Sequence, residues 1–273
     1  MYLFYVQGGG LGHITRIHSL IKKLHIASEK VSIITSSSFT EYFKEYTFVK
    51  MSWNESADNW SKIIIDTMRN YEDFICYIDT FPFGIKGELF QVYKTFPNIE
   101  YKYVSRILKW QNYLDALPEE ITVQFSETLL LERLYPEHFH WIQQHSKKTT
   151  QLTLDYGPVS PAPFLNSPYA MVVHSGGKEG VLHIIHRALE DLQTKPHLTL
   201  VVFTQVDIGI NNSRIIIHKN VYPVSKYYPH AEIIYTAAGF NSMQELRSYR
   251  YKHIAIPLEK LYDDQFFRYT NYS

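Results

Sequence analysis

Short apolar runs alternate with segments of helical periodicity along most of this chain. Tyr2–Val6 and Val31–Thr35 have the composition of strands, and between them Ile14, Ile17 and Ile21 recur at steps of three and four, as on one face of a helix. Further runs of this kind lie at residues 74–78, 101–104, 121–125, 169–173, 198–203, 215–218, 233–235 and 253–256. Near-continuously apolar strands separated by helices pair in parallel and carry helices on both sheet faces. The pattern predicts an α/β fold.

The pattern is interrupted once, at residues 153–168. This segment, "TLDYGPVSPAPFLNSP", carries four prolines and has no helical period, which is typical of a semi-rigid connector. At 273 residues the chain also exceeds the ~100–200 residues of a usual domain. We therefore expect an N-terminal domain at 1–152, a linker at 153–168 and a C-terminal domain at 169–273. Two such halves suggest facing Rossmann-like domains with parallel sheets and an interdomain cleft.

The composition excludes several classes of protein. Lys+Arg and Asp+Glu are equal at 27 each, so no overall field attracts nucleic acid. The single cysteine, Cys76, forms no internal disulfide and fits the cytosol, where we expect it to be a small buried hydrophobe. The N-terminus lacks a signal-peptide pattern, and no apolar stretch approaches the ~20 residues of a membrane span. A cytoplasmic protein is expected, and peripheral contact with the inner face of the membrane stays open.

The first strand leads into "GGGLGH", with four glycines in the five positions 8–12. A plain strand-to-helix turn needs one or two glycines, whereas a backbone that a ligand must approach closely favours more. We therefore take Gly10 and Gly12 as ligand-binding candidates. A dinucleotide site fits poorly, because G-x-G-x-x-G counted from Gly8 places His13 at the last glycine and no acidic residue ends Val31–Thr35.

Three charged or titratable side chains are expected near the ends of strands in the first half. The N-terminal dipole of the helix at His13 opposes protonation, which suits a general base near neutral pH, although a hydrogen bond to the loop is an equal alternative. Asp79 follows the run 74–78 and either orients an acceptor hydroxyl and polarises His13 or anchors the turn. Arg106 either meets an anionic acceptor or pairs with a carboxylate.

The second half repeats the strand–glycine–helix design twice. "VVHSGGKEG", residues 172–180, precedes an expected helix at 178–192. In "AEIIYTAAGFNSMQEL", residues 231–246, a turn ends at Gly239 and Asn241 or Ser242 is expected to cap the next helix. Free amides there can hold a diphosphate. Glu245 either completes a capping box with Ser242 or accepts the hydroxyls of a ribose.

Together, "GGGLGH", "TAAGFNSMQEL" and "IAIPLEKLYDDQ" resemble motifs of GT-B glycosyltransferases, in particular the family of the N-acetylglucosaminyltransferase that makes lipid II. "YIDTFPFGIKGEL" and "VSRILKW" are similar to blocks of bacterial proteins known only as predicted glycosyltransferases, which is the closer likeness. The resemblance implies an inverting transfer from a nucleotide sugar, UDP-linked by default, to the hydroxyl of a sugar or lipid-linked acceptor. No Asp-x-Asp motif occurs, so no metal and no other cofactor is expected.

The resemblance also implies roles for individual residues, with the donor bound mainly by the C-terminal half. His13 becomes the base, Glu245 the ribose ligand, and the turn 239–242 the diphosphate site. The residue Val221 marks the stretch where such enzymes read the base. The remaining donor contacts are Gly10, Gly12, Ser175, Gly176 and Gly177 (the last three facing the donor across the cleft), and Asp264 and Gln265 on the donor sugar.

Family members continue beyond the point where this chain ends, at Ser273, so the resemblance implies shortened C-terminal helices. A partner or a homodimer would then replace the missing surface. Two other activities stay open. One is a nucleotide-sugar hydrolase of the same fold, like the compact enzymes of pseudaminic acid synthesis, in which His13 activates water. The other is a non-catalytic subunit that binds nucleotide sugars.

Overall fold

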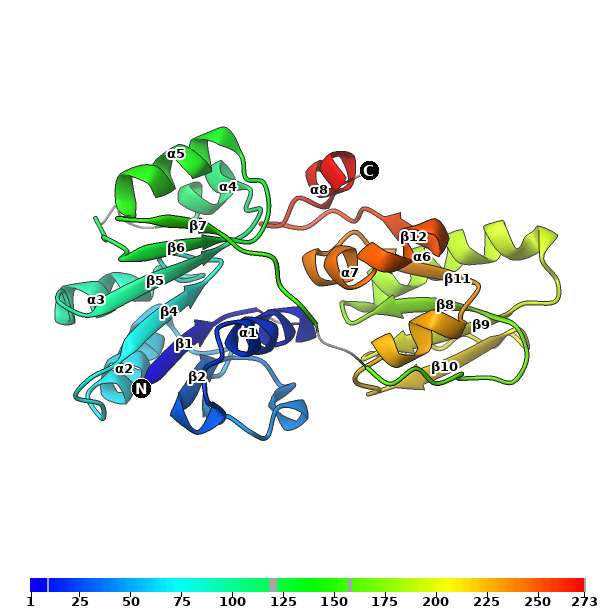
Figure 1. The fold of residues 1–273 in the computed structure, drawn as a ribbon, viewed down its shortest axis with the longest axis horizontal. Coiled ribbons are helices and arrows are strands. Elements are labelled where there is room, and N and C mark those ends of the chain that lie inside the picture. The colour runs from blue at the N-terminus through cyan, green and yellow to red at the C-terminus, as the bar shows by residue number, and fades with distance from the viewer. Residues whose placement is uncertain (9, 118–121, 157–158, 273) are drawn as a thin grey trace. The chain divides into compact units, whose positions relative to one another are not determined.

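The computed structural model describes residues 1–8, 10–117, 122–156 and 159–272, which divide into two units (Figure 1). The first unit comprises Met1–Asp155 together with Leu261–Asp263. The second comprises Tyr156–Lys260 and the residues from Asp264 on. Each unit is built on its own parallel sheet.

The first unit holds a seven-stranded sheet in which every pairing is parallel, with helices packed on it (Figure 1). Its elements in chain order are β1 (Tyr2–Val6), α1 (Leu11–Lys23), β2 (Val31–Thr35), β3 (Thr47–Lys50), α2 (Ala57–Met68), β4 (Ile75–Asp79), α3 (Leu89–Thr95), β5 (Glu100–Ser105), α4 (Trp110–Asp115), β6 (Glu127–Leu130), α5 (Pro136–His145) and β7 (Thr149–Gln151), with short 3-10 helices at Ser28–Lys30 and Thr40–Tyr42. The strand order is β3-β2-β1-β4-β5-β6-β7.

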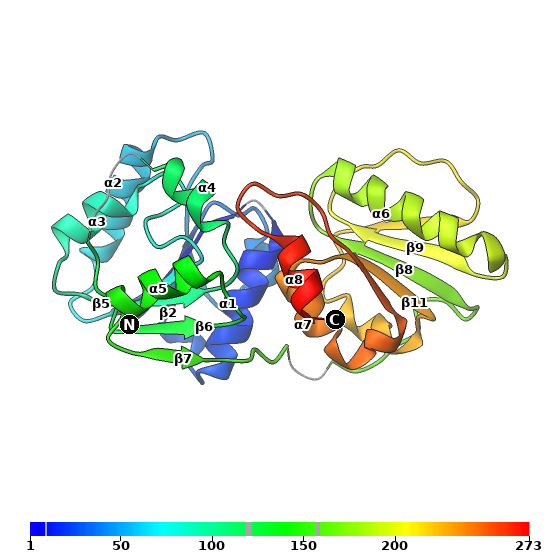
Figure 2. The same cartoon turned by 90° about the horizontal axis from the view of Figure 1, so that it is seen from above.

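The second unit holds a five-stranded parallel sheet in the order β10-β9-β8-β11-β12. Figure 2 shows α6 lying along one face of this sheet, over β8 and β9. The elements are β8 (Tyr169–His174), α6 (Lys178–Asp191), β9 (Thr199–Thr204), β10 (Ile215–Lys219), β11 (Ile233–Ala237), α7 (Phe240–Glu245), β12 (His253–Ile256) and α8 (Gln265–Tyr272), with 3-10 helices at Leu192–Thr194, Ser225–His230 and Arg247–Lys252.

Both sheets have the doubly wound topology predicted from the alternating pattern. In each, the order of strands reverses about one central pair, which is β1 and β4 in the first sheet and β8 and β11 in the second. Ligands of open α/β sheets bind beyond the carboxyl ends of the strands at such a reversal. The loops after these four strands are therefore the places to look for a site.

Most of the predicted strands form within a residue or two of their expected bounds, but the strand predicted at residues 121–125 is wrong. The strand of this region is β6, Glu127–Leu130, and Phe125 makes only an isolated bridge to Ser146. Residue 121 lies outside the described residues. The short strands β3 and β7 were not predicted, because both are half-exposed edge strands with few apolar residues.

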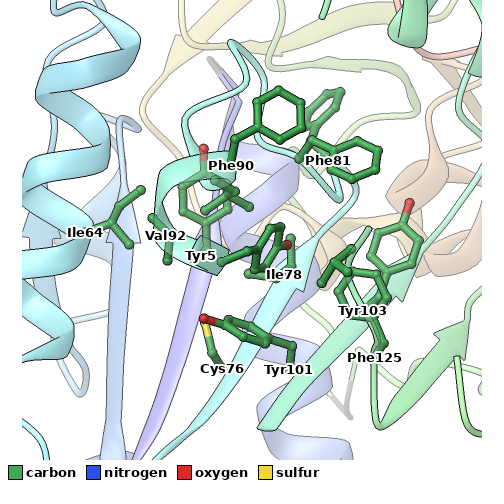
Figure 3. Packing of buried hydrophobic residues seen from close by; sticks show 14 of the residues in the cluster. Tyr5, Ile64, Cys76, Ile78, Phe81, Phe90, Val92, Tyr101, Tyr103 and Phe125 are labelled. Atoms are coloured by element: carbon green, nitrogen blue, oxygen red, sulfur yellow. The ribbon is translucent and has the colours of Figure 1, made fainter. Parts of the chain in front are cut away.

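The core of the first unit packs aromatic and aliphatic side chains from the central strands against helices α2 and α3 (Figure 3). Cys76 lies in this core, opposite Tyr101 on the neighbouring strand, and is 3% exposed. Burial raises the pKa of its thiol to about 12, so the expected buried, unreactive cysteine is confirmed. No helix of the described residues is long and apolar enough to cross a membrane.

Candidate active site

The loop after β1 is fixed by two residues that directly follow the strand. Gln7 is fully buried, and its Oε1 accepts hydrogen bonds from the backbone N–H and the hydroxyl of Ser36, at 3.2 and 2.7 Å, beyond the end of β2. Gly8 has φ +155°, and a Cβ built on it would lie 2.2 Å from Cδ2 of His13. Glycine is required here because the His13 ring packs directly on the backbone.

His13 and Asp79 meet at the reversal point of the first sheet. His13 is the third residue of α1, which follows β1, and Asp79 is the last residue of β4. Nδ1 of His13 lies 2.8 Å from Oδ2 of Asp79. The His13 side chain is 16% exposed, whereas that of Asp79 is fully buried. Of the alternatives that the sequence left open for Asp79, the structure shows the contact with His13, and the catalytic roles of both residues stay predictions.

A third residue, Arg16, completes this cluster and was not predicted. It lies one turn after His13 in α1, and its side chain is 3% exposed. Its Nε donates to Oδ1 of Asp79 at 2.9 Å, and its Nη2 donates to Oδ2 of the same carboxylate and to Oγ1 of Thr80, the latter at 2.9 Å. A two-point contact between a guanidinium and a buried carboxylate is a strong, charge-assisted interaction.

The charges of the cluster set the protonation states. Burial and then the charge of Arg16 lower the pKa of His13 to about 4, and Asp79 only partly opposes them. Burial alone would raise the pKa of Asp79, but Arg16 and the His13 hydrogen bond outweigh it and hold that pKa well below its ordinary value. At neutral pH the pair is therefore a neutral imidazole beside an ionised carboxylate. The imidazole is neutral as predicted, but the causes are burial and Arg16, where the sequence suggested the helix dipole.

The loop that follows Asp79 is held by buried polar groups. Thr80 has φ +66°, a left-handed conformation that a β-branched residue rarely adopts, and its carbonyl accepts a 2.7 Å hydrogen bond from Tyr103. Glu88, 1% exposed, accepts hydrogen bonds from the backbone N–H groups of Ile85 and Lys86, at 3.1 and 2.8 Å. This part of the chain is thus fixed on both sides of the loop.

Arg106 pairs with an acidic residue of its own unit. Its Nη1 donates to Oδ1 of Asp263 at 2.5 Å, and the two side chains are 8% and 14% exposed. Nearby, the backbone N–H of Lys109 donates to the carbonyl of Tyr262 at 2.7 Å. Of the two roles that the sequence left open for Arg106, the structure displays the pair with a carboxylate. A role toward an anionic acceptor stays a prediction.

In the second unit the loop Ser175–Gly176–Gly177 follows β8 and leads into α6, which begins after Gly177. A Cβ on Gly176 would lie 2.5 Å from Nε2 of His174, so this glycine lets the loop cross over the His174 ring. Gly177 has no atom within 4 Å of such a Cβ. Burial and the charge of Lys260 lower the pKa of His174 to about 4, which makes this ring neutral at physiological pH.

The turn after β11 lies beside this loop in the same sheet, because β8 and β11 are neighbours. Helix α7 begins after Gly239, whose backbone is extended, and no side chain caps it. The predicted cap by Asn241 or Ser242 is wrong, because the helix starts one residue after Gly239 and places both inside its first turn. Asn241 accepts instead a 2.9 Å hydrogen bond from Tyr156.

Glu245, the last residue of α7, does not form the capping box either. Its Oε2 accepts a hydrogen bond from the hydroxyl of Tyr228, at 3.2 Å, and Tyr228 is 3% exposed. Burial raises the pKa of Glu245 to about 7, although the Tyr228 hydrogen bond lowers it. The structural alternative that the sequence offered for Glu245 is therefore absent, and its carboxyl group is positioned by a tyrosine.

The residues before and in α8 support the same turn. Asp264 precedes the helix, and its Oδ1 accepts from the backbone N–H of Phe267 at 2.8 Å. Oε1 of Gln265 accepts from the backbone N–H of Leu258 at 3.0 Å. Arg268 is fully buried and donates from Nη1 to the carbonyl of Ala238, next to Gly239, at 3.0 Å. Asp264 and Gln265 thus have structural partners, and their predicted contact with a donor sugar stays a prediction.

The structure brings the predicted residues into two groups, one at each sheet reversal. His13 and Asp79 form the first group, and Gly10 and Gly12 lie near them at the start of α1. The loops of Ser175 and Gly239 form the second group. Sequence reasoning missed Gly8, Arg16, Tyr228 and Arg268. For Arg16 a signal existed, because it lies three residues after His13 on one helix. Within the described part of the chain, no group of three or more His, Cys, Asp and Glu side chains converges as a metal site.

Comparison with solved structures shows which fold these units represent. The "glycotransferase of kitacinnamycin" matches with a TM-score of 0.65 at 12% identity, over 99% of this chain and 84% of that one. MurG of Acinetobacter baumannii matches with a TM-score of 0.52 at 11% identity, over 98% and 82%. A putative UDP-N-acetylglucosamine 2-epimerase from Listeria monocytogenes matches with a TM-score of 0.62 at 11% identity, over 89% and 76%.

These likenesses and the two parallel sheets show the GT-B fold that the sequence predicted. No family model matches the sequence, and no curated protein matches it either. At 11–12% identity the solved structures carry the fold and not a particular activity, and one of the three is described as an epimerase. The particular likeness to the lipid II-forming type is therefore not shown by these matches.

Proposed function

We propose that this chain is a glycosyltransferase that uses a nucleotide sugar as donor and His13 as general base. The observation that carries the proposal is the pair of the partly exposed His13 and the fully buried Asp79, 2.8 Å apart, at the reversal point of the first sheet. A neutral imidazole held by an ionised carboxylate is suited to take a proton from a hydroxyl group. The GT-B fold supports the choice of sugar transfer over other proton-transfer chemistry.

In the proposed reaction, the acceptor oxygen attacks the anomeric carbon of the donor sugar while the bond to the diphosphate breaks. The hydroxyl proton passes to His13, and the electron pair of the broken bond leaves with the nucleoside diphosphate. The configuration at the anomeric carbon is inverted, because a single displacement occurs. No protein-bound metal is needed if backbone amides stabilise the developing negative charge on the diphosphate.

The donor is proposed to bind the second unit, with UDP as the default nucleotide. The loop of Ser175, Gly176 and Gly177 and the turn at Gly239, Asn241 and Ser242 flank the reversal between β8 and β11, where α/β sheets bind phosphates. Glu245 is proposed to accept the two ribose hydroxyls, since Tyr228 already fixes one of its oxygens. Asp264 and Gln265 are proposed to contact the donor sugar.

Calorimetric titration with UDP, dTDP and GDP tests the donor half of this proposal. We expect one nucleotide to bind wild-type protein and Glu245→Ala to weaken that binding at least tenfold, because a ribose held by a buried carboxylate loses about 1.5–3 kcal/mol with it. Glu232→Ala is the matched control, since this glutamate belongs to the same unit and its side chain is 49% exposed. If none of the three nucleotides binds, the proposal fails.

The acceptor is proposed to be a hydroxyl of a sugar or of a lipid-linked sugar. If nucleoside diphosphate is released with water as the only acceptor, and neither sugars nor membrane lipids increase the rate, the activity is hydrolysis and not transfer. Nucleotide binding without any release would indicate a binding subunit. The proposal of transfer requires that an added acceptor accelerate release and become glycosylated.

A further inference from the structure

Arg16 is a buried arginine to which the proposed reaction assigns no role. Its side chain is 3% exposed, and burying a guanidinium without a partner is costly. Asp79 is its main partner, but Asp79 also contacts His13. Nη2 of Arg16 lies 2.9 Å from Nδ1 of His13 as well. The three residues therefore share their hydrogen bonds, and the sharing determines which nitrogen of His13 carries the proton.

The hydrogens of Arg16 can be counted. Nη2 carries two, but it lies within hydrogen-bond distance of three atoms that can accept, which are Oδ2 of Asp79, Oγ1 of Thr80 and Nδ1 of His13. An ionised carboxylate only accepts, so the 2.8 Å contact between Nδ1 and Asp79 is a hydrogen bond in which Nδ1–H donates. With that hydrogen on Nδ1, the ring nitrogen cannot also accept from Arg16, and the two hydrogens of Nη2 go to Asp79 and Thr80. The second ring nitrogen, Nε2, then carries the lone pair.

From this count we propose that Arg16 is a positioning residue, which keeps Asp79 ionised and His13 in the Nδ1–H tautomer so that Nε2 accepts the proton of the attacking hydroxyl. The chemistry of this inference rests on the proposed function. The tautomer itself is a property of the protein without substrate and is measured separately.

The surroundings of Asp79 show why Arg16 is needed. Asp79 is fully buried, and burial favours the protonated acid over the carboxylate. Without the guanidinium, Asp79 would tend to take up a proton and donate it to Nδ1, and the ring would then carry its own proton on Nε2. His13 in that tautomer cannot act as the base, and a wrong tautomer of a catalytic histidine lowers kcat by as much as ~10⁴-fold.

Thr80 fixes the direction from which Arg16 reaches the carboxylate. The left-handed backbone of Thr80, φ +66°, turns its Oγ1 toward Nη2 of Arg16. Its carbonyl is bonded by the hydroxyl of Tyr103, which is fully buried on β5. A strained residue held by two buried partners next to Asp79 is what a preorganised site requires. Nη2 of Arg16 thus has a fixed acceptor besides Asp79 for its second hydrogen.

The charges facing His13 act in both directions. Arg16 and, more weakly, Arg106 lower its pKa, and Asp79 raises it. Arg106 itself is paired with Asp263. Removing the charge of Arg16 therefore raises the proton affinity of the His13–Asp79 pair while removing the group that holds the tautomer of His13. A purely structural role for Arg16 would lower stability without this change in titration.

Imidazole ¹⁵N NMR tests the inference on three proteins: wild type, Arg16→Gln and Arg16→Lys. His13→Ala identifies the His13 signal, and Arg69→Gln is the control, since the Arg69 side chain is 63% exposed. In wild type we expect a protonated Nδ1 and an unprotonated Nε2 at pH 7. In Arg16→Gln we expect the pair of His13 and Asp79 to take up a proton at a pH about one unit or more higher than in wild type, with the ring then neutral and protonated on Nε2.

Steady-state kinetics supply the second readout once a nucleotide sugar that the protein turns over has been identified. Arg16→Gln is expected to lower kcat about 100-fold or more, with KM for the nucleotide sugar changed less than threefold, and to move the acidic limb of the pH–rate profile upward together with the NMR midpoint. Arg16→Lys keeps the charge but not the fork, so its midpoint stays close to wild type while kcat falls. If Arg16→Gln does not fold, the inference is tested by the tautomer of His13 in wild type and by the midpoint and kcat of Arg16→Lys.

A wild-type His13 protonated on Nε2 would overturn the inference, and so would an unchanged tautomer and midpoint in Arg16→Gln. Neither result depends on substrate, so failure of the inference is distinguishable from failure of the proposed function. The latter would appear as absence of nucleotide binding, with the tautomer as we infer it.

Discussion

Gly8→Ala is the substitution for which the structure makes the sharpest prediction. The added Cβ would lie 2.2 Å from Cδ2 and 2.5 Å from Nε2 of His13, where ordinary contact begins at 3.4 Å. The ring must therefore move by more than about 1 Å. A displacement of that size breaks the 2.8 Å contact with Asp79 or moves Nε2 away from the acceptor. We expect activity to fall about 100-fold, the usual effect of a 1 Å misplacement of a reacting group.

The effect on stability is smaller and has a separate cause. An alanine at the φ of +155° of Gly8, a region that is nearly restricted to glycine, costs about 1–3 kcal/mol. A domain with a stability of roughly 5–15 kcal/mol tolerates that loss, so the variant is expected to fold. Loss of activity with a modest fall in Tm therefore separates displacement of His13 from unfolding.

The assay combines release of nucleoside diphosphate, thermal unfolding and the imidazole NMR signal of His13. Gly10→Ala is the control for the NMR signal alone, because no atom lies within 4 Å of a Cβ built on Gly10 and the His13 signal should not change. Its activity is not compared, since Gly10 is itself a candidate ligand-binding residue. Wild-type activity together with an unchanged His13 signal in Gly8→Ala would refute the reasoning, since the ring would then not be confined by the backbone at that point.

Three further predictions concern the carboxyl groups and the metal. The carboxylate form of Glu245 binds ribose hydroxyls, so with a pKa of about 7 nucleotide affinity should fall about tenfold between pH 8 and pH 6, and affinity that does not change with pH contradicts this role. Burial raises the pKa of Glu88 to about 7, so the native state keeps this proton while the unfolded chain loses it near 4.5, and the contribution of Glu88 to stability should fall as pH rises from about 4.5 to 7. Buried histidines such as His13 and His174 contribute a slope of the opposite sign, so the test is the difference in free energy of unfolding between wild type and Glu88→Gln, which should fall over this range in chemical denaturation. A difference that does not change with pH would be evidence against it. Excess EDTA should leave the rate of nucleoside diphosphate release within twofold, and loss of activity that Mg²⁺ restores would contradict a metal-independent reaction.

The fold was largely predictable because its signals are local. Runs such as Tyr2–Val6 and His253–Ile256 are apolar and end in glycine, proline or polar residues, so their bounds follow from the sequence alone. Edge strands give no such signal: β7 is Thr149–Gln151, three polar residues held by pairing with β6. The strand expected at 121–125 is wrong because the apolar run there lies just before the segment that pairs with β5, which is β6.

The candidate site was predictable only in part. The carboxyl ends of parallel strands meet at one edge of a sheet, which is why the sequence offers contact between His13 and Asp79 as one of two alternatives for Asp79. A charged residue in an amphipathic helix usually faces solvent, so the burial of Arg16 emerges only from the packed structure. The opening run of glycines likewise does not show which member is indispensable, because that depends on where the His13 ring comes to lie on Gly8.

The measurement that tests the central claim most directly is release of nucleoside diphosphate from a panel of UDP-, dTDP- and GDP-sugars, with and without added sugar and lipid acceptors. His140→Ala serves as control for His13→Ala, because His140 is an exposed histidine of α5. We predict that one donor is turned over, that an acceptor accelerates its turnover, and that His13→Ala lowers the rate at least 100-fold while nucleotide affinity stays within threefold of wild type. Equal rates for wild type and His13→Ala, or no release from any donor, would contradict the account.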